Sequence, residues 1–321
     1  ADVVQEARSV FTVDGRAPEL WDPIAGLYPC GDGGHVRLHT NFAHHRDGLL
    51  RLLGLAPGPG TARSAVAQAL QPWRAADLEQ AAADAALVAA AARRFADWDA
   101  HPQGLAVAAQ PLLALRRHGD AAPPRWQALP AGARPLQGLR VLDLTRILAG
   151  PVAGRTLAAY GADVLLVNGP QLPNIEAIAD TSRGKRSAHV DLKTDAGRDT
   201  LRALVRDADV LLQAYRPGAL AALGFAADDL WRLNPSLVVV GLSAYGDTGP
   251  WAGRRGFDSL VQTATGFNLA EAEACGSPEP RALPLQALDY GAGFLLAFGA
   301  LAACLRRASE GGGWQVGVTL A

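Results

Sequence analysis

The chain has 321 residues, of which 49% are hydrophobic and 19% are charged, a composition typical of a folded protein and unlike that of a disordered one. Its length exceeds the usual size of one hydrophobic core, so two domains are expected. Lys and Arg total 30 against 31 for Asp and Glu, so the chain offers no net field that would attract nucleic acid or an anionic membrane.

The cysteines Cys30, Cys275 and Cys304 are far apart and lack metal-ligand spacing, which predicts a reducing compartment and no disulfide framework. The longest apolar stretch, 294–305, is shorter than the about 20 residues that cross a bilayer, so a buried helix is expected there. The first residues lack the pattern of a signal peptide, and we expect a cytoplasmic protein. The chain has no methionine and ends inside a strand-like run, 314–321, which suggests a fragment of a longer protein.

Residues 1–125 alternate short apolar runs with polar turns and predict a small α+β domain. Within it, the stretch 77–101 is rich in strong helix formers and is expected to be strongly helical. The segment 126–136 lies in a run dense in Pro, Gly and Ala, and we interpret it as a linker. Residues 137–321 are then expected to form a second, larger domain.

Four histidines, His35, His39, His44 and His45, lie close together in the first domain. They flank a glycine turn and an expected strand rather than one helical face, and no carboxylate or cysteine lies at matching spacing. No metal site is therefore predicted.

The second domain alternates short β-branched runs with helical segments. Strands are expected at 140–145, 162–167, 209–214 and 237–245, and helices at 151–161 and 194–208. This alternation predicts βαβ units and a doubly wound, mainly parallel sheet of the Rossmann-like type. Because the glycine patterns of dinucleotide and P-loop sites are missing, neither kind of site is signalled.

Ligands of open α/β sheets bind beyond the carboxyl ends of the strands, and the first loop of this kind is TRILAGP, 145–151. Gly150 and Pro151 favour a tight turn into a helix, and Arg146 could contact a phosphate. An ordinary βα loop with a surface arginine is the simpler interpretation of this segment alone.

Two further loops carry cations. Arg183, Lys185 and Arg186 could bind phosphates by charge-assisted hydrogen bonds, although a solvated basic turn fits these residues equally. Tyr215 and Arg216 end a strand and could stack on a purine and face a phosphate, or they could simply pack and cap.

Asp289 opens a largely apolar helix whose first turn contains Gly291 and Gly293. A carboxylate in this position is stabilised by the helix dipole, and the missing side chains leave room for a substrate. The alternative is an N-cap aspartate with glycines that allow close helix packing, and the residues alone favour that alternative.

Taken together, the chain resembles the family III coenzyme A (CoA) transferases, a group with formyl-CoA and carnitine-type CoA-transferases and the related α-methylacyl-CoA racemases. The resemblance is collinear over roughly 185 residues, and several long motifs in fixed order carry it. These motifs are LRVLDLTRILAGPVAGRTLAAYGADV (139–164), the segment 183–225 that begins RGKRSAHVDLK, the segment 234–266 that begins NPSLVVVGLSAYGDTGP, and LDYGAGF (288–294).

The resemblance implies that Asp289 is a nucleophile that attacks an acyl-CoA thioester and passes through an aspartyl-CoA intermediate. The implied substrates are acyl-CoA and a small carboxylic acid, with no tightly bound cofactor. The positions that match the CoA site of the family are Arg146, Ala149, Lys185, Val190, Tyr215 and Arg216.

The chain departs from the family pattern at Leu148, Asn168 and Ala214, where relatives have Gln, Glu and Asn respectively. These departures leave a CoA-binding homologue without turnover as one alternative. The other alternative is a racemase-like isomerase. Phe257 stands where the racemases have a histidine base, which favours transfer over isomerisation.

Residues 27–54 and 95–115 resemble, more weakly, the smaller domain of the family. In the family this domain follows the large one, whereas here it precedes it. We therefore expect a fused or tandem chain, which acts as a homodimer or as an intramolecular pseudo-dimer.

Overall fold

The computed structural model describes residues 12, 14–17, 19–124, 129–171 and 174–321. These residues form two compact units. The first unit comprises the described residues of Ala1–Ala109, Ala244–Leu288 and Leu320–Ala321, and the second comprises those of Gln110–Ser243 and Asp289–Thr319.

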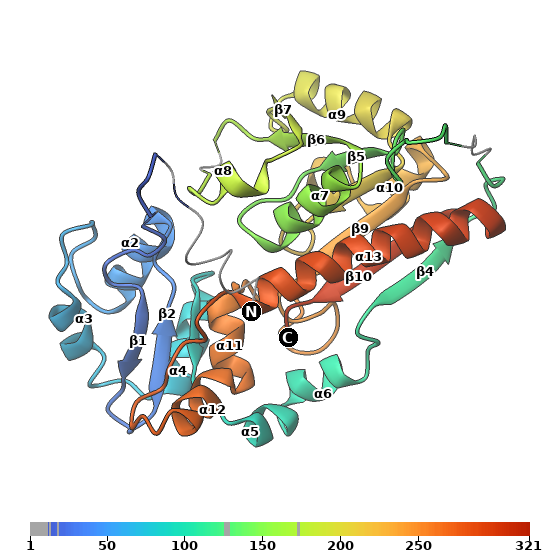
Figure 1. Cartoon of the computed structure of the whole chain (residues 1–321). Helices are drawn as coiled ribbons and strands as arrows, with labels where there is room; N and C mark the ends of the chain where they lie inside the picture. Colours follow the sequence, from blue (N-terminus) through green and yellow to red (C-terminus); the bar gives the residue numbers. More distant parts are fainter. Residues whose placement is uncertain (1–11, 13, 18, 125–128, 172–173) are drawn as a thin grey trace. The chain divides into compact units, whose positions relative to one another are not determined.

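The second unit is built on a seven-stranded sheet with the strand order β4-β10-β9-β8-β5-β6-β7 (Figure 1). The strands are β4 (Ala114–His118), β5 (Arg140–Asp143), β6 (Asp163–Asn168), β7 (Arg186–His189), β8 (Val210–Gln213), β9 (Val238–Ser243) and β10 (Gly313–Thr319). All neighbours are parallel except β4, which pairs antiparallel with β10 at the edge. The predicted large, mainly parallel sheet is confirmed.

The order of these strands fixes where a ligand is expected. From β5 the chain moves outward to β6 and β7, and it then returns to the other side of β5 for β8, β9 and β10. This is the order of a doubly wound sheet, with its switch point between β5 and β8. The loops that follow these two strands therefore border the crevice in which such sheets bind ligands.

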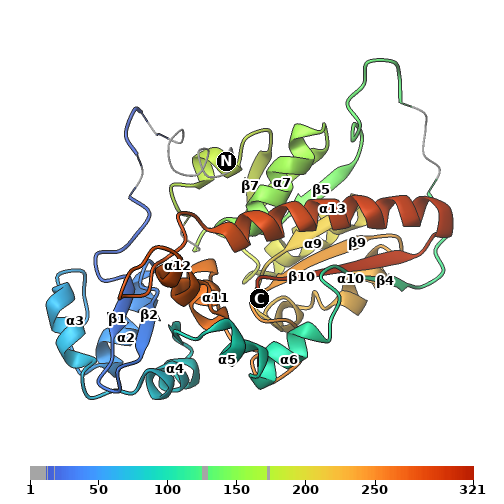
Figure 2. The same ribbon diagram turned by 60° about the horizontal axis from the view of Figure 1, so that its bottom comes forward.

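Helices cover both faces of this sheet (Figures 1 and 2). On one face, α9 (Asp195–Asp207) and α10 (Ala227–Leu233) share a buried core with Leu142, Leu211 and Val239. The short helices α8 (Ile178–Thr181) and η2 (Ala221–Leu223) lie in the connections after β6 and β8. Burial of the apolar strand side chains from both sides explains why these strands read as nearly continuous apolar runs.

The opposite face is covered by α7 (Ala149–Ala159) and α13 (Ala287–Glu310). Glycines bring both helices close to the strands. A Cβ on Gly154 of α7 would lie 2.2 Å from Asp143 Oδ2 of β5, and a Cβ on Gly299 of α13 would lie 2.6 Å from Val316 Cγ1 of β10.

α13 is longer than the apolar stretch 294–305 that marks it in the sequence. It has 24 residues with a mean hydropathy of 1.7 in its most apolar window, so length and composition alone would let it cross a membrane. However, 56% of that window is buried inside the protein. Near its end the buried Arg307 donates hydrogen bonds to the carbonyl of Ser236 and the carboxylate of Asp209.

The first unit contains a three-stranded antiparallel sheet in the order β1-β2-β3. Its elements are β1 (Gly26–Pro29), β2 (His35–Leu38), β3 (Ala89–Ala91), α2 (Ala43–Leu52), α3 (Arg63–Ala69), α4 (Ala75–Asp84), α5 (Phe95–Asp99), α6 (Pro102–Ala108), α11 (Asp258–Thr265) and α12 (Phe267–Ala274). Buried Leu38, Leu49, Leu50, Leu70 and Leu78 form much of its core.

The stretch 77–101, expected to be strongly helical, is helical only at its two ends, in α4 and α5, with β3 between them. α4 ends at Asp84, Ala86 has a positive φ of 55°, and the three alanines of β3 pair with β2. Alanine has the highest helix propensity, but propensity is a weak preference that strand pairing and packing override. A short strand of small residues therefore cannot be distinguished from helix by composition.

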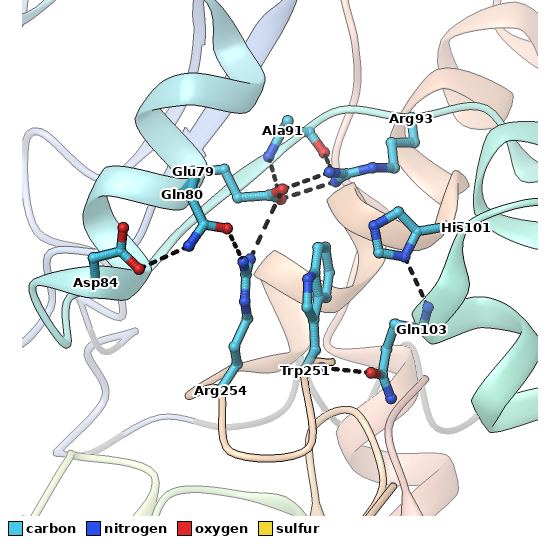
Figure 3. A network of polar contacts seen from close by, with 9 residues as sticks. All are labelled: Glu79, Gln80, Asp84, Ala91, Arg93, His101, Gln103, Trp251 and Arg254. Atoms are coloured by element: carbon cyan, nitrogen blue, oxygen red, sulfur yellow. Dashed lines mark hydrogen bonds and ion pairs between the residues drawn. The ribbon is translucent and has the colours of Figure 1, made fainter. Parts of the chain in front are cut away.

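A polar network joins two of the three chain segments of the first unit (Figure 3). The buried carboxylate of Glu79 accepts hydrogen bonds from the backbone N–H of Ala91 at 2.9 Å and from Arg93 Nη1 at 2.8 Å, and it lies 4.0 Å from Arg254 Nη1. Nearby, the Trp251 N–H donates to Gln103 Oε1 at 2.6 Å. These contacts fix residues 79–103 against residues 251–254.

The domain boundaries expected from the sequence differ from the two units. Residues 244–288, expected in the large domain 137–321, belong to the first unit, and the unit boundary lies at 109/110 rather than in the segment 126–136. β4 precedes the proline-dense run and already pairs with β10. Proline disfavours helix and sheet at its own position, but it does not show whether the strands on either side belong to the same domain. Residues 126–128 of the expected linker lie outside the described part of the chain.

Candidate functional site

The loop between β5 and α7 carries the first group of candidate residues. It passes through Ile147, a β-branched residue with a positive φ of 76°, before the N-cap Leu148. This conformation costs about 1–3 kcal/mol for such a residue and persists only where the surroundings enforce it. The turn leaves the positive end of the α7 dipole at the switch point of the sheet.

Contacts of Thr145 at the start of the loop and of Gly150 at its end hold this conformation. Thr145 donates hydrogen bonds to Asp143 Oδ1 from its backbone N–H at 2.9 Å and from its hydroxyl at 2.5 Å. Gly150 leaves the space that the Thr145 side chain occupies, since a Cβ on this glycine would lie 2.3 Å from Thr145 Cβ. The Thr145 side chain, which bonds to Asp143 and packs against Gly150, therefore ties together the two ends of the loop that carries Arg146.

Arg146 and Tyr215 come together at the carboxyl ends of β5 and β8. Both are half-buried, and each affects the ionisation of the other. Burial lowers the pKa of the Arg146 guanidinium and raises the pKa of the Tyr215 phenol, while the interaction between the two groups opposes both shifts. The Tyr215 backbone N–H donates to Gln213 Oε1 at 3.1 Å. Two loops separated by about 70 positions thus form one side of the crevice.

The other residues expected in the CoA site have different environments. Ala149 is the first residue of α7 and is buried. Val190 is buried in the core beneath α9, and its backbone N–H donates to the Asn168 carbonyl at 2.9 Å. Arg216 is exposed.

Lys185 does not lie on an open basic loop. Its Nζ is 2.7 Å from Asp143 Oδ2 and 2.9 Å from the Pro151 carbonyl oxygen, and both charged side chains are sealed from solvent. A buried carboxylate needs a paired cation, and this requirement fixes the lysine. The expectation that its ammonium contacts a phosphate is therefore not supported by its position, and Lys185 instead braces the loop that carries Arg146.

The neighbouring cations Arg183 and Arg186 are exposed, and each pairs with a carboxylate. Arg186 Nη2 lies 2.5 Å from Asp163 Oδ2, and Arg183 Nη2 lies 2.5 Å from Asp180 Oδ1. The three cations themselves look alike in the sequence, and none of them shows which one enters the core. A signal does exist in Asp143, a charged residue at the end of an otherwise apolar strand.

Asp289 is the third residue of α13 and retains 9% of its exposure. It lies within the first helical turn rather than at the capping position before it, so the N-cap interpretation does not describe this helix. Gly293 follows one turn later on the same helix face. A Cβ at Gly293 would lie 2.6 Å from the Ala149 carbonyl oxygen and 2.8 Å from Val152 Cβ. The face that bears Asp289 therefore meets the first turn of α7.

Substitution of Gly293 by alanine is expected to push α13 away from α7 and to destabilise the protein by about 1–3 kcal/mol. Gly291 provides a matched control in the same helix, because a Cβ there meets nothing within 4 Å. Gly291→Ala is expected to be neutral or to stabilise by up to about 1 kcal/mol through helix propensity. Urea unfolding of both variants measures the difference, and equal effects would contradict the close approach of the two helices.

The histidines do not form a metal site in the described residues. No three His, Cys, Asp or Glu side chains are grouped as metal ligands in that part of the chain. His39, His44 and His45 all pack against Phe42: the His39 ring stacks on it, His44 lies tilted to it and His45 meets it edge-on. His35 lies elsewhere and contacts Glu279 at 2.7 Å. The three cysteines are free thiols.

Known proteins resemble the second part of the chain. The family model "CoA-transferase family III" matches residues 136–321, which is more than half of the chain. The probable fatty acyl-CoA transferase Rv3272 of Mycobacterium tuberculosis is 38% identical over 193 residues, covering 56% of this chain and 48% of that relative. The succinate–glutarate CoA-transferase of Agrobacterium fabrum is 39% identical over 170 residues, covering 47% of this chain and 42% of that relative.

Solved structures of similar proteins also align with this chain, over more than half of each. A crystal structure of the Rv3272 protein of Mycobacterium tuberculosis aligns with a TM-score of 0.51 at 36% identity, and it covers 59% of this chain and 55% of that one. The chain spans about half the length of the curated relatives that it matches. The family match and these alignments show that the chain belongs to CoA-transferase family III.

Proposed function

We propose that the protein to which this chain belongs transfers CoA between an acyl-CoA and a small carboxylic acid, with Asp289 as the nucleophile. The observation that carries the proposal is the position of Asp289 in the first turn of α13, on the face that meets the N-terminus of α7. A carboxylate there lies near the free amides of α7, where negative charge that develops in the reaction is stabilised.

The proposed reaction has balanced steps. The Asp289 carboxylate attacks the thioester carbonyl, and the carbon–sulfur bond breaks, which releases CoA as a thiolate and leaves a mixed anhydride between the acyl group and Asp289. The thiolate then attacks the aspartyl carbonyl, which gives an aspartyl-CoA thioester and releases the first carboxylic acid as its carboxylate. The acceptor carboxylate reverses both steps, so that the new acyl-CoA leaves and Asp289 is regenerated. No proton transfer to carbon is required.

Within this proposal, Arg146 and Tyr215 hold the CoA nucleotide. Arg146 offers charge-assisted hydrogen bonds to a phosphate, and the Tyr215 ring offers a surface for the purine. Ala149 leaves space beside the α7 N-terminus, while Val190 shapes the core behind the loop. The exposed Arg216 is free to reach a phosphate as well. We further propose that the enzyme is cytoplasmic and acts as a homodimer or an intramolecular pseudo-dimer.

Arg146→Gln is expected to weaken CoA binding by about ten- to hundredfold, because a hydrogen bond to a charged group contributes about 1.5–3 kcal/mol. Arg140→Gln is the matched control, since Arg140 is exposed at the amino end of the same strand, away from the switch point. Isothermal titration of each variant with CoA measures the effect. Equal affinities for the two variants would remove Arg146 from the proposed site.

The proposed function is tested by CoA exchange between an acyl-CoA and a panel of labelled carboxylic acids, with hydroxylamine added to trap an acyl-enzyme. Transfer of label into acyl-CoA, together with a hydroxamate on Asp289 identified by mass spectrometry, is the expected result. Binding of CoA without exchange on any acid would instead identify a homologue without turnover. Exchange of the substrate α-proton with deuterium would identify an isomerase.

A further inference from the structure

The pairing of β8 with its neighbouring strands ends before the chain reaches Tyr215. The last pair with β9 is Gln213 and Gly241, and the last pair with β5 is Leu212 and Asp143. A partly buried backbone N–H beyond the end of a strand pairing needs another acceptor. The Tyr215 N–H finds it in the side chain of Gln213, where Oε1 accepts the hydrogen bond at 3.1 Å. A side chain therefore holds the backbone at the point where strand pairing no longer does.

Gly241 provides the space in which this amide lies. Because a backbone N–H can only donate, the Gln213 amide turns its oxygen to Tyr215 and its nitrogen away from it. That nitrogen, Nε2, lies 3.0 Å from the position of a Cβ built on Gly241. Such a contact is tighter than most in proteins, so an alanine there displaces the amide by a few tenths of an ångström. A side chain at position 241 therefore acts on the hydrogen bond that Gln213 makes to Tyr215.

Tyr215 depends on this hydrogen bond for its direction. Among the described residues, Gln213 Oε1 is the acceptor of its backbone N–H. The Tyr215 ring packs against the core that α9 and α10 share with the sheet, and its phenol interacts with the Arg146 guanidinium. The chain turns directly afterwards, where the Ala219 N–H donates to the Arg216 carbonyl at 3.0 Å. Without the Gln213 bond, the Tyr215 backbone would lack its hydrogen-bond anchor between β8 and this turn.

We propose that Gln213 is a positioning residue for the nucleotide of CoA, and that it acts through Tyr215. The bond to Oε1 orders the Tyr215 backbone in advance, so that the ring already points to where the purine stacks. A loop that is ordered before binding loses less conformational entropy when the ligand binds, and the affinity is higher. This inference rests on the proposed function, in which Tyr215 and Arg146 hold the nucleotide. It concerns the nucleotide alone, so binding of the pantetheine arm should not depend on Gln213.

Gln213→Met removes the acceptor but keeps an unbranched side chain of similar length. It is expected to bind CoA and the adenosine bisphosphate fragment of CoA about two- to tenfold more weakly, the range for one neutral hydrogen bond. Phosphopantetheine lacks the purine, so its affinity should not change. Isothermal titration of the whole chain with each compound measures these effects. In the exchange assay, the KM for acyl-CoA should rise while kcat stays unchanged, because the purine is held equally in the ground state and in the transition state.

A double-mutant cycle tests whether Gln213 acts through Tyr215. Tyr215→Ala removes the ring but keeps the backbone N–H, and it should by itself weaken binding of the adenosine bisphosphate fragment. If the amide matters because it places the ring, Gln213→Met should cause no further loss in the Tyr215→Ala protein. Equal losses in both backgrounds would mean that Gln213 does not act through Tyr215, and the proposal would be overturned.

Two glycines in neighbouring strands provide matched variants that leave Gln213 itself unchanged. Gly241 of β9 and Gly317 of β10 lie opposite each other, but among the described residues a Cβ on Gly317 would meet only Ala114 Cβ, at an ordinary 3.6 Å. Gly241→Ala should therefore weaken binding of the adenosine bisphosphate fragment, whereas Gly317→Ala should not. Both replace a glycine within a strand, so the effect on strand stability is shared. This pair also tests the proposal if Gln213→Met does not fold, and equal affinities of the two glycine variants would contradict it.

Failure of this inference can be distinguished from failure of the proposed function. Absence of CoA binding to the unmodified protein would remove the proposed CoA site and this inference with it. Equal affinity of the unmodified protein and of Gln213→Met for CoA would overturn the positioning role alone. An equal loss of affinity for phosphopantetheine would overturn it as well, since the substitution would then disturb the whole crevice.

Discussion

Asp289→Asn is expected to lower the rate of CoA exchange by at least about 10³-fold, the largest effect that we predict. The amide has nearly the same shape as the carboxylate but cannot attack a thioester carbonyl as an anion. Gly293 makes the close approach between α13 and α7, and an asparagine occupies the same space as an aspartate, so the helix should remain in place. Exchange of label between a carboxylic acid and acyl-CoA measures the rate.

The controls for this prediction separate chemistry from folding. Glu310→Gln changes an exposed carboxylate at the far end of the same helix and should leave the rate unchanged. The Asp289→Asn protein should keep its Tm and its affinity for CoA, and it should form no hydroxamate when acyl-CoA and hydroxylamine are added. An asparagine variant that retains full exchange, shown by mass spectrometry not to have reverted to aspartate, would exclude Asp289 as the nucleophile.

Much of the second unit can be predicted from the sequence, because its signals are local. β9 reads as an unbroken apolar run since its side chains are buried on both faces, and Thr194 caps α9 as expected, accepting a hydrogen bond from the Gly197 N–H at 3.0 Å. The position of Arg146 at the switch point can also be predicted from the sequence, because the loop after the first strand of this βαβ series lies there.

What could not be predicted depends on contacts between distant segments. Residues 244–288 join the first unit because their helices pack against β2, β3 and α5, and nothing in their own composition distinguishes them from the large domain. The positive φ of Ile147 is also invisible in the sequence, since a β-branched residue normally avoids that conformation. It is imposed by the chain around it, through Thr145 and Asp143.

The most instructive failure concerns Lys185. Next to Arg183 and Arg186 it has the appearance of a phosphate-binding loop, and only the fold shows that its ammonium enters the core to meet Asp143. Lys185 immediately precedes β7 and its side chain is buried, whereas Arg186, the first residue of that strand, stays exposed. A cation cluster in a sequence therefore cannot be assigned to one ligand until the direction of each side chain is known.

The buried pair gives the second large expected effect, since Lys185→Met should destabilise the protein by about 3–5 kcal/mol. The variant leaves the Asp143 carboxylate sealed in the core, where among the described residues only Thr145 then donates hydrogen bonds to it. Arg186→Met, one residue away, removes one member of an exposed ion pair and should cost no more than about 1 kcal/mol. Urea unfolding of both variants compares a buried and an exposed cation at adjacent positions.

A second substitution identifies the origin of this loss. In Lys185→Met combined with Asp143→Asn the buried charge is gone, while the amide oxygen can still accept from Thr145. The double variant should therefore recover part of the stability, with a coupling energy of about 1–3 kcal/mol in a double-mutant cycle. Strictly additive effects would mean that the two side chains do not interact. Because the same pair braces the loop of Arg146, the single variant should also bind CoA more weakly, and the double variant should restore that affinity in parallel with its stability.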